Sequence, residues 1–417
     1  MKSSMKYRSN IGQCVTGVAL LLTLVITPFS ALYAANESEI ITNLSIHNEE
    51  NNKQHFSLKN KKISKLDLLK NSYDKFPENP DIAAKLAMGY IQVARNNTDP
   101  SYYRLANKVM QPWAKKPLIP GVANKETPDV IRLVRATLSQ HDHHYADAND
   151  DLLKIIQKQP RNAQAWLTLS TIQLVQGDYK KAQVSCSALS RVSSRWIASL
   201  CYSQLYSLTG SAQRAYNMQK ILLSQISKQQ TELRLWVTGL MGESALRMGD
   251  KSLAEQHFKA GIKIKNNDTY ILRTYSEFLI ENKRYKEVKK LLNVFTHDDQ
   301  LLLRLAIASK HLKEGTKTAV FIKTLGQRFE STLARNSHIH GRDEALFLLE
   351  FKSNDESSKK RALKLAVTNW KTQKEPDDAL ILLRAAIANQ EKGQVKVVFD
   401  WIQTHKLQDH RIRNLLN

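Results

Sequence analysis

Residues 160–189 read PRNAQAWLTLSTIQLVQGDYKKAQVSCSAL, and this stretch decides the fold. Apolar residues recur three and four positions apart on both sides of the triplet Gly177-Asp178-Tyr179, a pattern typical of two helices joined by a tight turn. Ala182 lies early in the second helix, where a small side chain lets the two helices cross closely. The stretch therefore predicts a helical hairpin.

This hairpin recurs along the chain. The small position returns at Ala148, Ala182, Ala215, Ala254, Val288 and Ala319, and the turn position returns at His143, Gly177, Gly210, Gly249, Lys283 and Glu314. Successive small positions are 34, 33, 39, 34 and 31 residues apart. With Trp166 as the large anchor and Ala182 as the small residue, the unit resembles the tetratricopeptide repeat (TPR) family, whose repeat is about 34 residues long. The resemblance implies an all-α fold in which the units stack into a right-handed superhelix.

The remaining chain is expected to extend this array with weaker repeats. Only 14 glycines and 10 prolines interrupt the whole sequence, so helices should dominate. We expect degenerate hairpins with a proline-containing loop at 61–127, a core TPR array at 128–330, and degenerate TPR-like helices with a cap at 331–417, where Gly393 is a predicted turn. Residues 35–60 are rich in Asn, Glu and Ser without periodicity and predict a disordered linker.

The first 34 residues are typical of a secretory signal peptide. Three basic residues precede an apolar run at about 15–26, and small residues lead to Ala34. The run is shorter than the roughly 20 apolar residues that span a membrane. We expect export to a periplasm, cleavage near Ala34 and no stable transmembrane anchor afterwards. The alternative is an uncleaved N-terminal anchor, because no alanine fills the upstream cleavage position.

A further resemblance, carried by AQAWLTL and NWKTQKEPDDA, links the chain to exported bacterial TPR proteins of uncharacterised function. This resemblance implies a fold and a compartment but no activity.

Loss of the signal peptide would leave Cys186 and Cys201 as the only cysteines. An even number of cysteines in an exported chain favours a disulfide, and two separate buried thiols are the alternative. Closing so short a loop stabilises a protein by about 3 kcal/mol.

The charge is strongly basic. Lys and Arg number 62 against 39 Asp and Glu, and loss of Lys2, Lys6 and Arg8 with the signal would reduce the formal net charge from +23 to +20. The basic residues are scattered without an arginine–aromatic or zinc-finger pattern, so nucleic-acid binding is not expected. The alternative partner for such a surface is an anionic envelope component, namely peptidoglycan, lipopolysaccharide or lipid. Lysines on exposed helix faces also serve solubility alone.

Two histidine clusters are candidate metal or catalytic sites. In SQHDHHYADA (139–148), His143 and His144 fill the positions that Gly177 and Asp178 fill one repeat later. We interpret the cluster His141–His144 as turn residues, because neighbouring side chains in a tight turn diverge and a metal needs convergent ligands.

The second cluster lies in SHIHGRDEAL (337–346) and contains His338, His340, Arg342, Asp343 and Glu344. A metal-dependent hydrolase is the corresponding alternative. A helix start explains the acids more simply, because Asp343 and Glu344 would offset the dipole in the first turn. No GxSxG, HExxH, Walker or GxGxxG pattern is present. We therefore expect no enzyme, no catalytic residues, no metal and no cofactor.

The inner surface of the array is the predicted partner-binding site. The first helix of each hairpin lines the concave side of a TPR array. The corresponding residues here are Gln164, Thr171, Gln204, Glu243, Tyr270, Arg273, Glu277, Arg304 and His311. The Lys and Asn residues with which some TPRs clamp a peptide carboxylate are missing. Arg273 and Arg304, one repeat apart, are predicted either to bind a partner's carboxylate or phosphate together, or to be neutralised internally by Glu277.

These observations predict a non-catalytic scaffold or adaptor of the bacterial cell envelope that binds a protein of unknown identity through its groove. A basic module that binds an anionic envelope component is the first alternative, and the hydrolase is the second.

Overall fold

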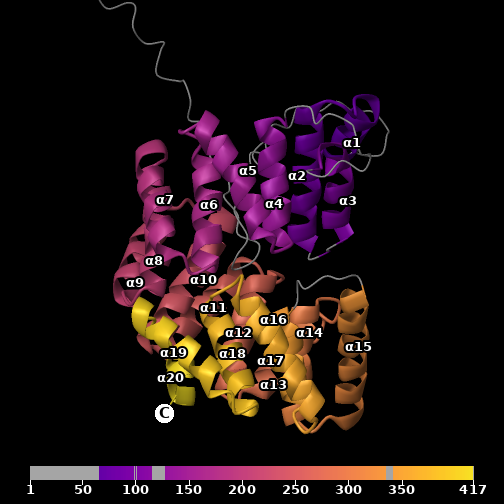
Figure 1. Ribbon diagram of the computed structural model, residues 1–417, viewed down its shortest axis with the longest axis vertical. Coiled ribbons are helices and arrows are strands. Elements are labelled where there is room, and N and C mark those ends of the chain that lie inside the picture. Colours follow the sequence, from indigo (N-terminus) through magenta and orange to yellow (C-terminus); the bar gives the residue numbers. More distant parts are fainter. Residues whose placement is uncertain (1–64, 98, 100, 115–126, 335–340, 417) are drawn as a thin grey trace, which may run out of the picture.

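The computed structural model describes residues 65–97, 99, 101–114, 127–334 and 341–416, and these ranges contain helices and turns but no strand (Figure 1). The expected signal peptide and linker lie outside the described residues, as do 115–126 of the proline-containing loop and both His338 and His340. The helices are α1 (Lys65–Lys75), α2 (Pro80–Asn97), α3 (Ser101–Met110), the 3-10 helix η1 (Gln111–Trp113), α4 (Asp129–His141), α5 (Tyr145–Lys158), α6 (Ala163–Val175), α7 (Tyr179–Val192), α8 (Arg195–Leu208), α9 (Ala212–Gln225), α10 (Thr231–Met248), α11 (Lys251–Ile264), α12 (Thr269–Glu281), α13 (Tyr285–Leu292), α14 (Asp299–His311), α15 (Gly315–Ala334), α16 (Gly341–Phe351), α17 (Glu356–Trp370), α18 (Pro376–Ala388), α19 (Lys392–His405) and α20 (His410–Leu416).

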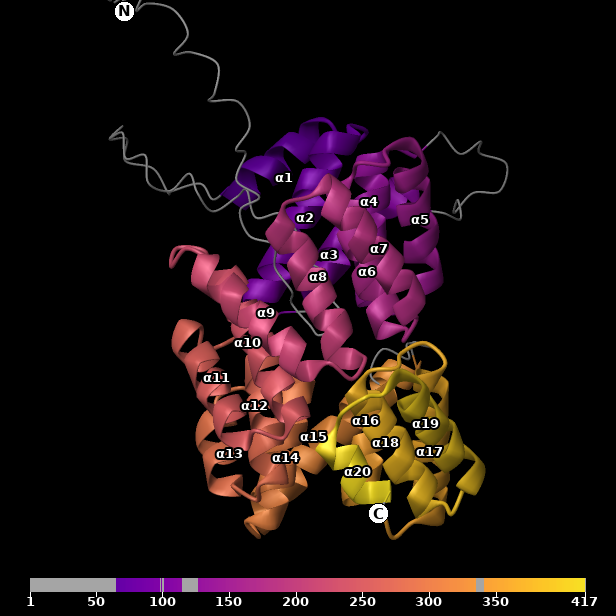
Figure 2. The same ribbon diagram turned by 90° about the vertical axis from the view of Figure 1, so that its left-hand side faces the viewer.

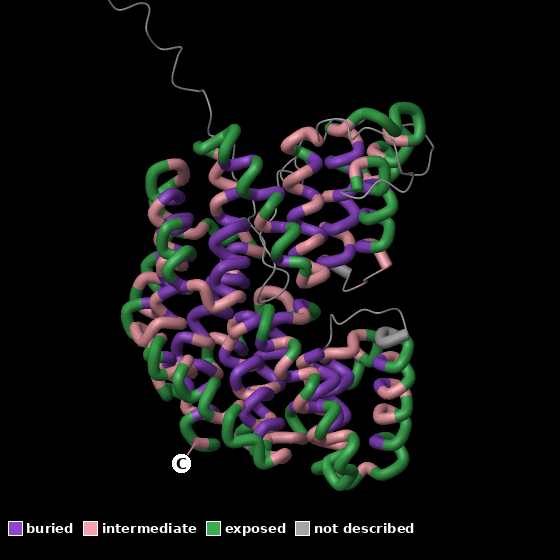
Figure 3. Tube along the Cα trace, viewed as in Figure 1, coloured by how far each residue is buried: buried purple, intermediate pink, exposed green. Residues whose placement is uncertain are grey.

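The helices pack in consecutive pairs that stack side by side. The pairs run from α2 with α3 to α18 with α19, and each first helix also contacts the pair before it. Buried residues follow the interior of the stack and exposed residues follow its outer surface (Figure 3). The expected all-α helical solenoid is confirmed. None of the helices in the described ranges is long and apolar enough to cross a membrane.

The turns confirm the predicted register and correct it at one repeat. His143, Gly177, Gly210, Gly249 and Lys283 all have positive φ, and the small residue five positions after each of them is fully buried. In the sixth repeat, Lys313 has the positive φ and Thr318 is buried, whereas Ala319 is exposed. The prediction of Glu314 and Ala319 was therefore wrong by one residue, because lysine fills a left-handed position that glycine usually marks.

The predicted turn at Gly393 was also displaced. The left-handed residue is Gln390, and Gly393 lies in the first turn of α19.

Helix starts are set by side-chain caps in many pairs. Each capping oxygen accepts a hydrogen bond from a backbone N–H in the first turn, which satisfies a donor that the helix leaves unpaired. The capping residues are Asn162, Asp178, Asp250, Asp268, Asp298 and Asp355.

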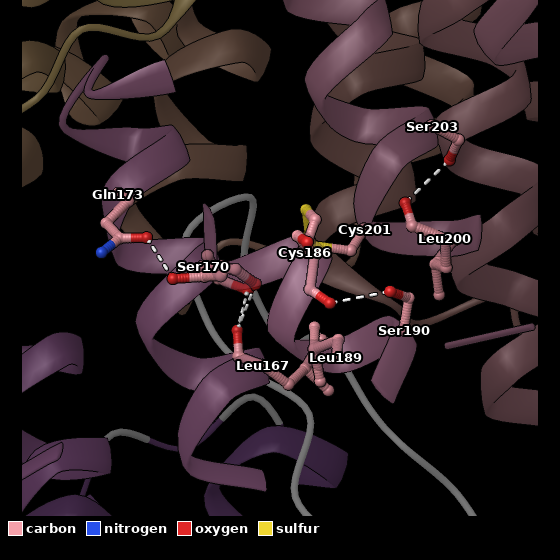
Figure 4. The surroundings of a disulfide bond; sticks show 12 residues. Leu167, Ser170, Gln173, Cys186, Leu189, Ser190, Leu200, Cys201 and Ser203 are labelled. Carbon is pink, nitrogen blue, oxygen red and sulfur yellow. Dashed lines mark hydrogen bonds between the residues drawn. A yellow bond between two sulfur atoms is a disulfide. The ribbon is translucent and has the colours of Figure 1, made fainter. Parts of the chain in front are cut away.

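The two cysteines form a disulfide between neighbouring helices. Cys186 of α7 and Cys201 of α8 are both buried and their Cα atoms lie 5.6 Å apart (Figure 4). The bond joins the second helix of one pair to the first helix of the next, so it reinforces a contact between repeats. The alternative of two separate thiols does not hold in this structure.

The C-terminal helices fold back against the turns of earlier repeats. The backbone N–H of Lys374 donates a hydrogen bond to the Val175 carbonyl at 2.7 Å, and Gln373 Nε2 lies 2.7 Å from His143 Nδ1. Gly210 approaches the backbone of Lys406 so closely that a Cβ built on Gly210 would lie 2.7 Å from the Lys406 carbonyl oxygen. Figures 1 and 2 show the yellow C-terminal helices beneath the magenta helices α6 and α7. The C-terminal part of the chain thus contacts the turns of three earlier repeats.

These contacts can be tested with two glycine variants. Gly210 and Gly249 both have positive φ, but a Cβ on Gly249 would meet nothing within 4 Å. We expect Gly249→Ala to cost about 1–2 kcal/mol of unfolding free energy through backbone strain alone. Gly210→Ala should cost about 1–3 kcal/mol more, because its methyl group also overlaps the Lys406 carbonyl.

Chemical denaturation measures both values, and hydrogen exchange of residues 371–411 reports the contacts directly. Equal losses of stability and unchanged exchange in the two variants would contradict a contact at Lys406.

Candidate functional site

A cavity lies on the inner side of the coil, where the early and late parts of the chain meet. Helices α6, α8, α10 and α12 supply one wall, and the first residues of α18 and α20 supply the other. Its volume is about 90 Å³. One water occupies roughly 10–15 Å³ on this measure, so the cavity has room for one side chain but not for another helix.

Five predicted groove residues converge on this cavity. They are Thr171, Gln204, Glu243, Tyr270 and Glu277, from four successive first helices. Repetition at the same register therefore places side chains from distant parts of the sequence on one surface.

Two other predicted groove residues lie outside the cavity wall. Gln164 is half-buried near the start of α6, and its amide donates to Thr168 Oγ1 at 3.3 Å. His311 is exposed at the end of α14 and stacks on Tyr285, with ring centroids 4.3 Å apart.

Arg273 and Arg304 face the chain's own carboxylates. Each side chain is only 3% exposed. Arg273 Nη1 lies 3.3 Å from both Glu277 and Asp377, whereas Arg304 Nη1 donates to Asp343 Oδ1 at 2.6 Å and Arg304 Nε donates to Glu277 at 3.0 Å. This geometry corresponds to internal neutralisation, the second of the two interpretations, although Asp343 and Asp377 join Glu277 as counter-ions.

The C-terminal side of the cavity contains groups that sequence reasoning missed. Arg411 lies 2.8 Å from Asp377, 2.7 Å from Asp409 and 3.3 Å from Glu281. Burial alone would raise the pKa of Asp377, but Arg411, Arg273 and Arg342 lower it below the usual range. Asp377 lies in the first turn of α18 and also links α12 to α20.

Glu281 is the titratable group of this wall whose protonation changes near neutral pH. Burial raises the pKa of Glu281 to about 7, with Asp409, Glu277 and Asp377 acting in the same direction, although Arg411 opposes the shift. His410 Nε2 lies 3.8 Å from the Glu281 carboxylate, and burial lowers the pKa of His410.

The histidine turn has a structural explanation. His143 Nδ1 lies 2.8 Å from the Tyr145 hydroxyl and 2.7 Å from Gln373 Nε2, so this ring joins the turn between α4 and α5 to the segment before α18. Asp343 and Glu344 occupy the first turn of α16, where they pair with Arg304 and Arg361. Within the described ranges, no three His, Cys, Asp or Glu side chains are grouped as metal ligands would be.

Comparison with known proteins returned structural similarity alone. No protein-family model and no curated protein matches the chain. The crystal structure of yeast Tom70 is 9% identical with a TM-score of 0.41, covering 84% of this chain and 82% of Tom70. The P58(IPK) TPR domain is 12% identical with a TM-score of 0.21, covering 78% of this chain and 93% of that domain. The chain itself has a TPR-like solenoid fold. Its own register carries this conclusion, since buried small residues follow left-handed turns by five positions in six repeats.

The internal pairing of Arg304 generates a stability prediction. Arg304→Gln would remove the guanidinium that pairs with the buried Asp343, so we expect a loss of about 3–5 kcal/mol of unfolding free energy. Arg361→Gln is the matched control, because Arg361 also pairs with an acid in the first turn of α16 but is 42% exposed. It should cost less than about 1 kcal/mol. Urea denaturation gives both values, and similar small losses would show that the Arg304 pair contributes little.

Proposed function

We propose that the chain is a non-catalytic scaffold or adaptor that binds a partner protein through the inner cavity. The observation that carries the proposal is the convergence of groove-register residues from four successive repeats on one hollow. A stacked helical array presents its inner surface as an extended binding face.

The cavity wall suits a single anchoring side chain of the partner. Trp236, Leu240 and Phe278 supply apolar surface beside the polar groups of Gln204 and Glu243. A long side chain with an apolar stem and a hydrogen-bond-donating tip would bury its stem against the first group and direct its tip to the second. The volume of about 90 Å³ limits the insertion to one such side chain.

Absence of catalysis is part of the proposal. The carboxylates around the cavity are engaged by arginines or by hydroxyls, as in the hydrogen bond of 2.7 Å that Tyr270 donates to Glu243. Asp343 and Glu344 of the alternative hydrolase cluster are likewise held in ion pairs. These contacts hold helices together, and they support a structural role for the carboxylates.

A cavity-filling variant tests the groove. Gln204 lines the cavity and is half-buried, so Gln204→Trp should occupy the space that the partner needs. Crosslinking and pull-down from intact cells should recover a set of proteins with the wild type and lose part of that set with Gln204→Trp. Arg273 and Arg304 are unsuitable for this purpose, because their burial means that charge reversal would disrupt folding.

The matched control is Gln256→Trp, on the exposed side of α11. It adds the same ring without touching the cavity and should recover the full set. Identical recovery by all three proteins would contradict the groove. The basic envelope-binding alternative rests on the net charge of +20 that remains after loss of the signal peptide. It predicts recovery that falls steeply as salt rises, whereas groove recognition should persist at moderate ionic strength.

We also propose that the protein is exported to the periplasm. The disulfide between Cys186 and Cys201 supports an oxidising compartment, since cytosolic thiols are kept reduced. Cell fractionation followed by N-terminal sequencing should find the protein in the periplasm, beginning just after Ala34 or Ala35. Recovery in the membrane fraction with the N-terminus intact would instead assign an uncleaved anchor.

A further inference from the structure

A second surface, formed by α7, α8 and α9, carries charge of one sign only. Residues 179–231 contain no Asp or Glu but contain seven basic residues, whereas the whole chain has 39 acids. The basic residues are Lys180, Lys181, Arg191, Arg195, Arg214, Lys220 and Lys228. Three consecutive helices without a carboxylate create a positive field in which an anionic group is attracted at long range.

A hollow on this surface combines arginine with tyrosine. We call it the tyrosine–arginine cleft; its lining includes Arg195, Tyr202, Tyr206 and Arg214, with Ser190 and Ser199 beside them. Its volume is about 380 Å³, which falls within the roughly 300–1,000 Å³ typical of ligand-binding clefts. The expectation that the basic residues lack an arginine–aromatic pattern was therefore wrong here, because α8 and α9 bring together residues that are apart in sequence.

The cleft is ordered before any ligand arrives. The rings of Tyr202 and Tyr206 are stacked with centroids 5.9 Å apart, and the Arg214 guanidinium lies 4.0 Å from the Tyr206 ring centre. Cys201, the residue before Tyr202, ties α8 covalently to α7. The stacked rings and the cation–π contact restrict the rotamers of the Arg214 side chain. Less side-chain entropy is therefore lost when a ligand binds.

The guanidinium groups in this cleft have no acidic partner among the described residues. Arg195 and Arg214 are exposed and take part in none of the ion pairs of the described ranges. Arg273 and Arg304, in contrast, are buried and Arg411 is half-buried, and all three are paired with acids. A guanidinium presents a planar fork of donors that matches a carboxylate, and tyrosine and arginine are the side chains that concentrate binding energy at protein interfaces.

We propose that the tyrosine–arginine cleft docks an acidic peptide segment of a partner protein, separately from the inner cavity. Carboxylates of the segment pair with Arg195 and Arg214, and its intervening side chains pack on the tyrosine rings. A single-stranded nucleic acid stacks its bases on open aromatic faces, and Arg214 covers one face of Tyr206. A bilayer is flat, whereas these arginines border a hollow. Both features favour the peptide.

The test uses the purified full-length protein and a fluorescent twelve-residue peptide of alternating Glu and Leu, with a Lys–Leu peptide as the probe of opposite charge. Fluorescence anisotropy at about 0.15 M salt should show binding of the Glu–Leu peptide only. Arg195→Glu/Arg214→Glu and, separately, Tyr202→Ala/Tyr206→Ala should each weaken it by about tenfold or more. Arg195→Lys/Arg214→Lys should give an intermediate loss, because charge remains but the planar fork is removed.

The matched control is Lys180→Glu/Lys228→Glu, which reverses two exposed charges on the same surface outside the cleft lining. It should retain most of the affinity, and Gln204→Trp should bind the peptide like the wild type. Circular dichroism verifies that each variant is folded. Failure of the wild type to bind the peptide, or an equal loss in both charge reversals, would overturn the proposal.

Competition assigns the ligand class. Polyglucuronate and phosphatidylglycerol vesicles are added to the bound peptide at matched anionic charge. The proposal requires that neither displaces the peptide more effectively than unlabelled peptide does. Stronger displacement by the polysaccharide or by the vesicles would overturn it in favour of a glycan or a lipid surface.

Discussion

The close crossing of two helices at a fully buried small side chain is the constraint on which the structure depends. Ala148, Ala182, Ala215 and Ala254 have no exposed surface, and each follows a left-handed turn residue by five positions. At that distance the second helix has completed its first turn and lies directly against the first. A residue larger than the Ala, Val or Thr found at this position would separate the pair and rotate every later pair relative to the earlier ones. The curvature that brings four first helices onto one cavity thus follows from a local packing rule.

The ion pairs of the inner wall follow from that curvature. Because the C-terminal helices fold back, α18 and α20 meet α12, and arginines that would otherwise point into an open groove face acids from later helices. Arg273 joins Asp377 across 104 positions of sequence. Burying such charges costs solvation, which the pairs offset only when every donor finds an acceptor. The network therefore ties α18 and α20 to α12.

Local periodicity made most of the fold predictable, and long-range contact made the rest unpredictable. Glycines at positions 177, 210 and 249 mark left-handed turns directly, so those repeats were placed correctly. Lys313 and Gln390 adopt the same conformation without the glycine signal, which displaced two predicted turns. Only part of the cavity wall could be predicted. Gln204, Glu243 and Tyr270 occupy equivalent positions in successive repeats, whereas Arg411 and Asp409 reach the wall only because the C-terminal helices contact earlier ones. No pattern within one repeat reports those contacts.

The hydrogen bonds of residues 373–374 with the turns at His143 and Val175 change how unfolding spreads through the molecule. In an open solenoid each repeat contacts only its neighbours, so the terminal repeats unfold first and a local distortion affects only a few repeats. In this chain the late repeats also contact the early ones. Unfolding of the last helical pair is then expected to disturb α5 and α6 as directly as α17. Cooperativity of unfolding is expected to extend from the last repeats to the early ones.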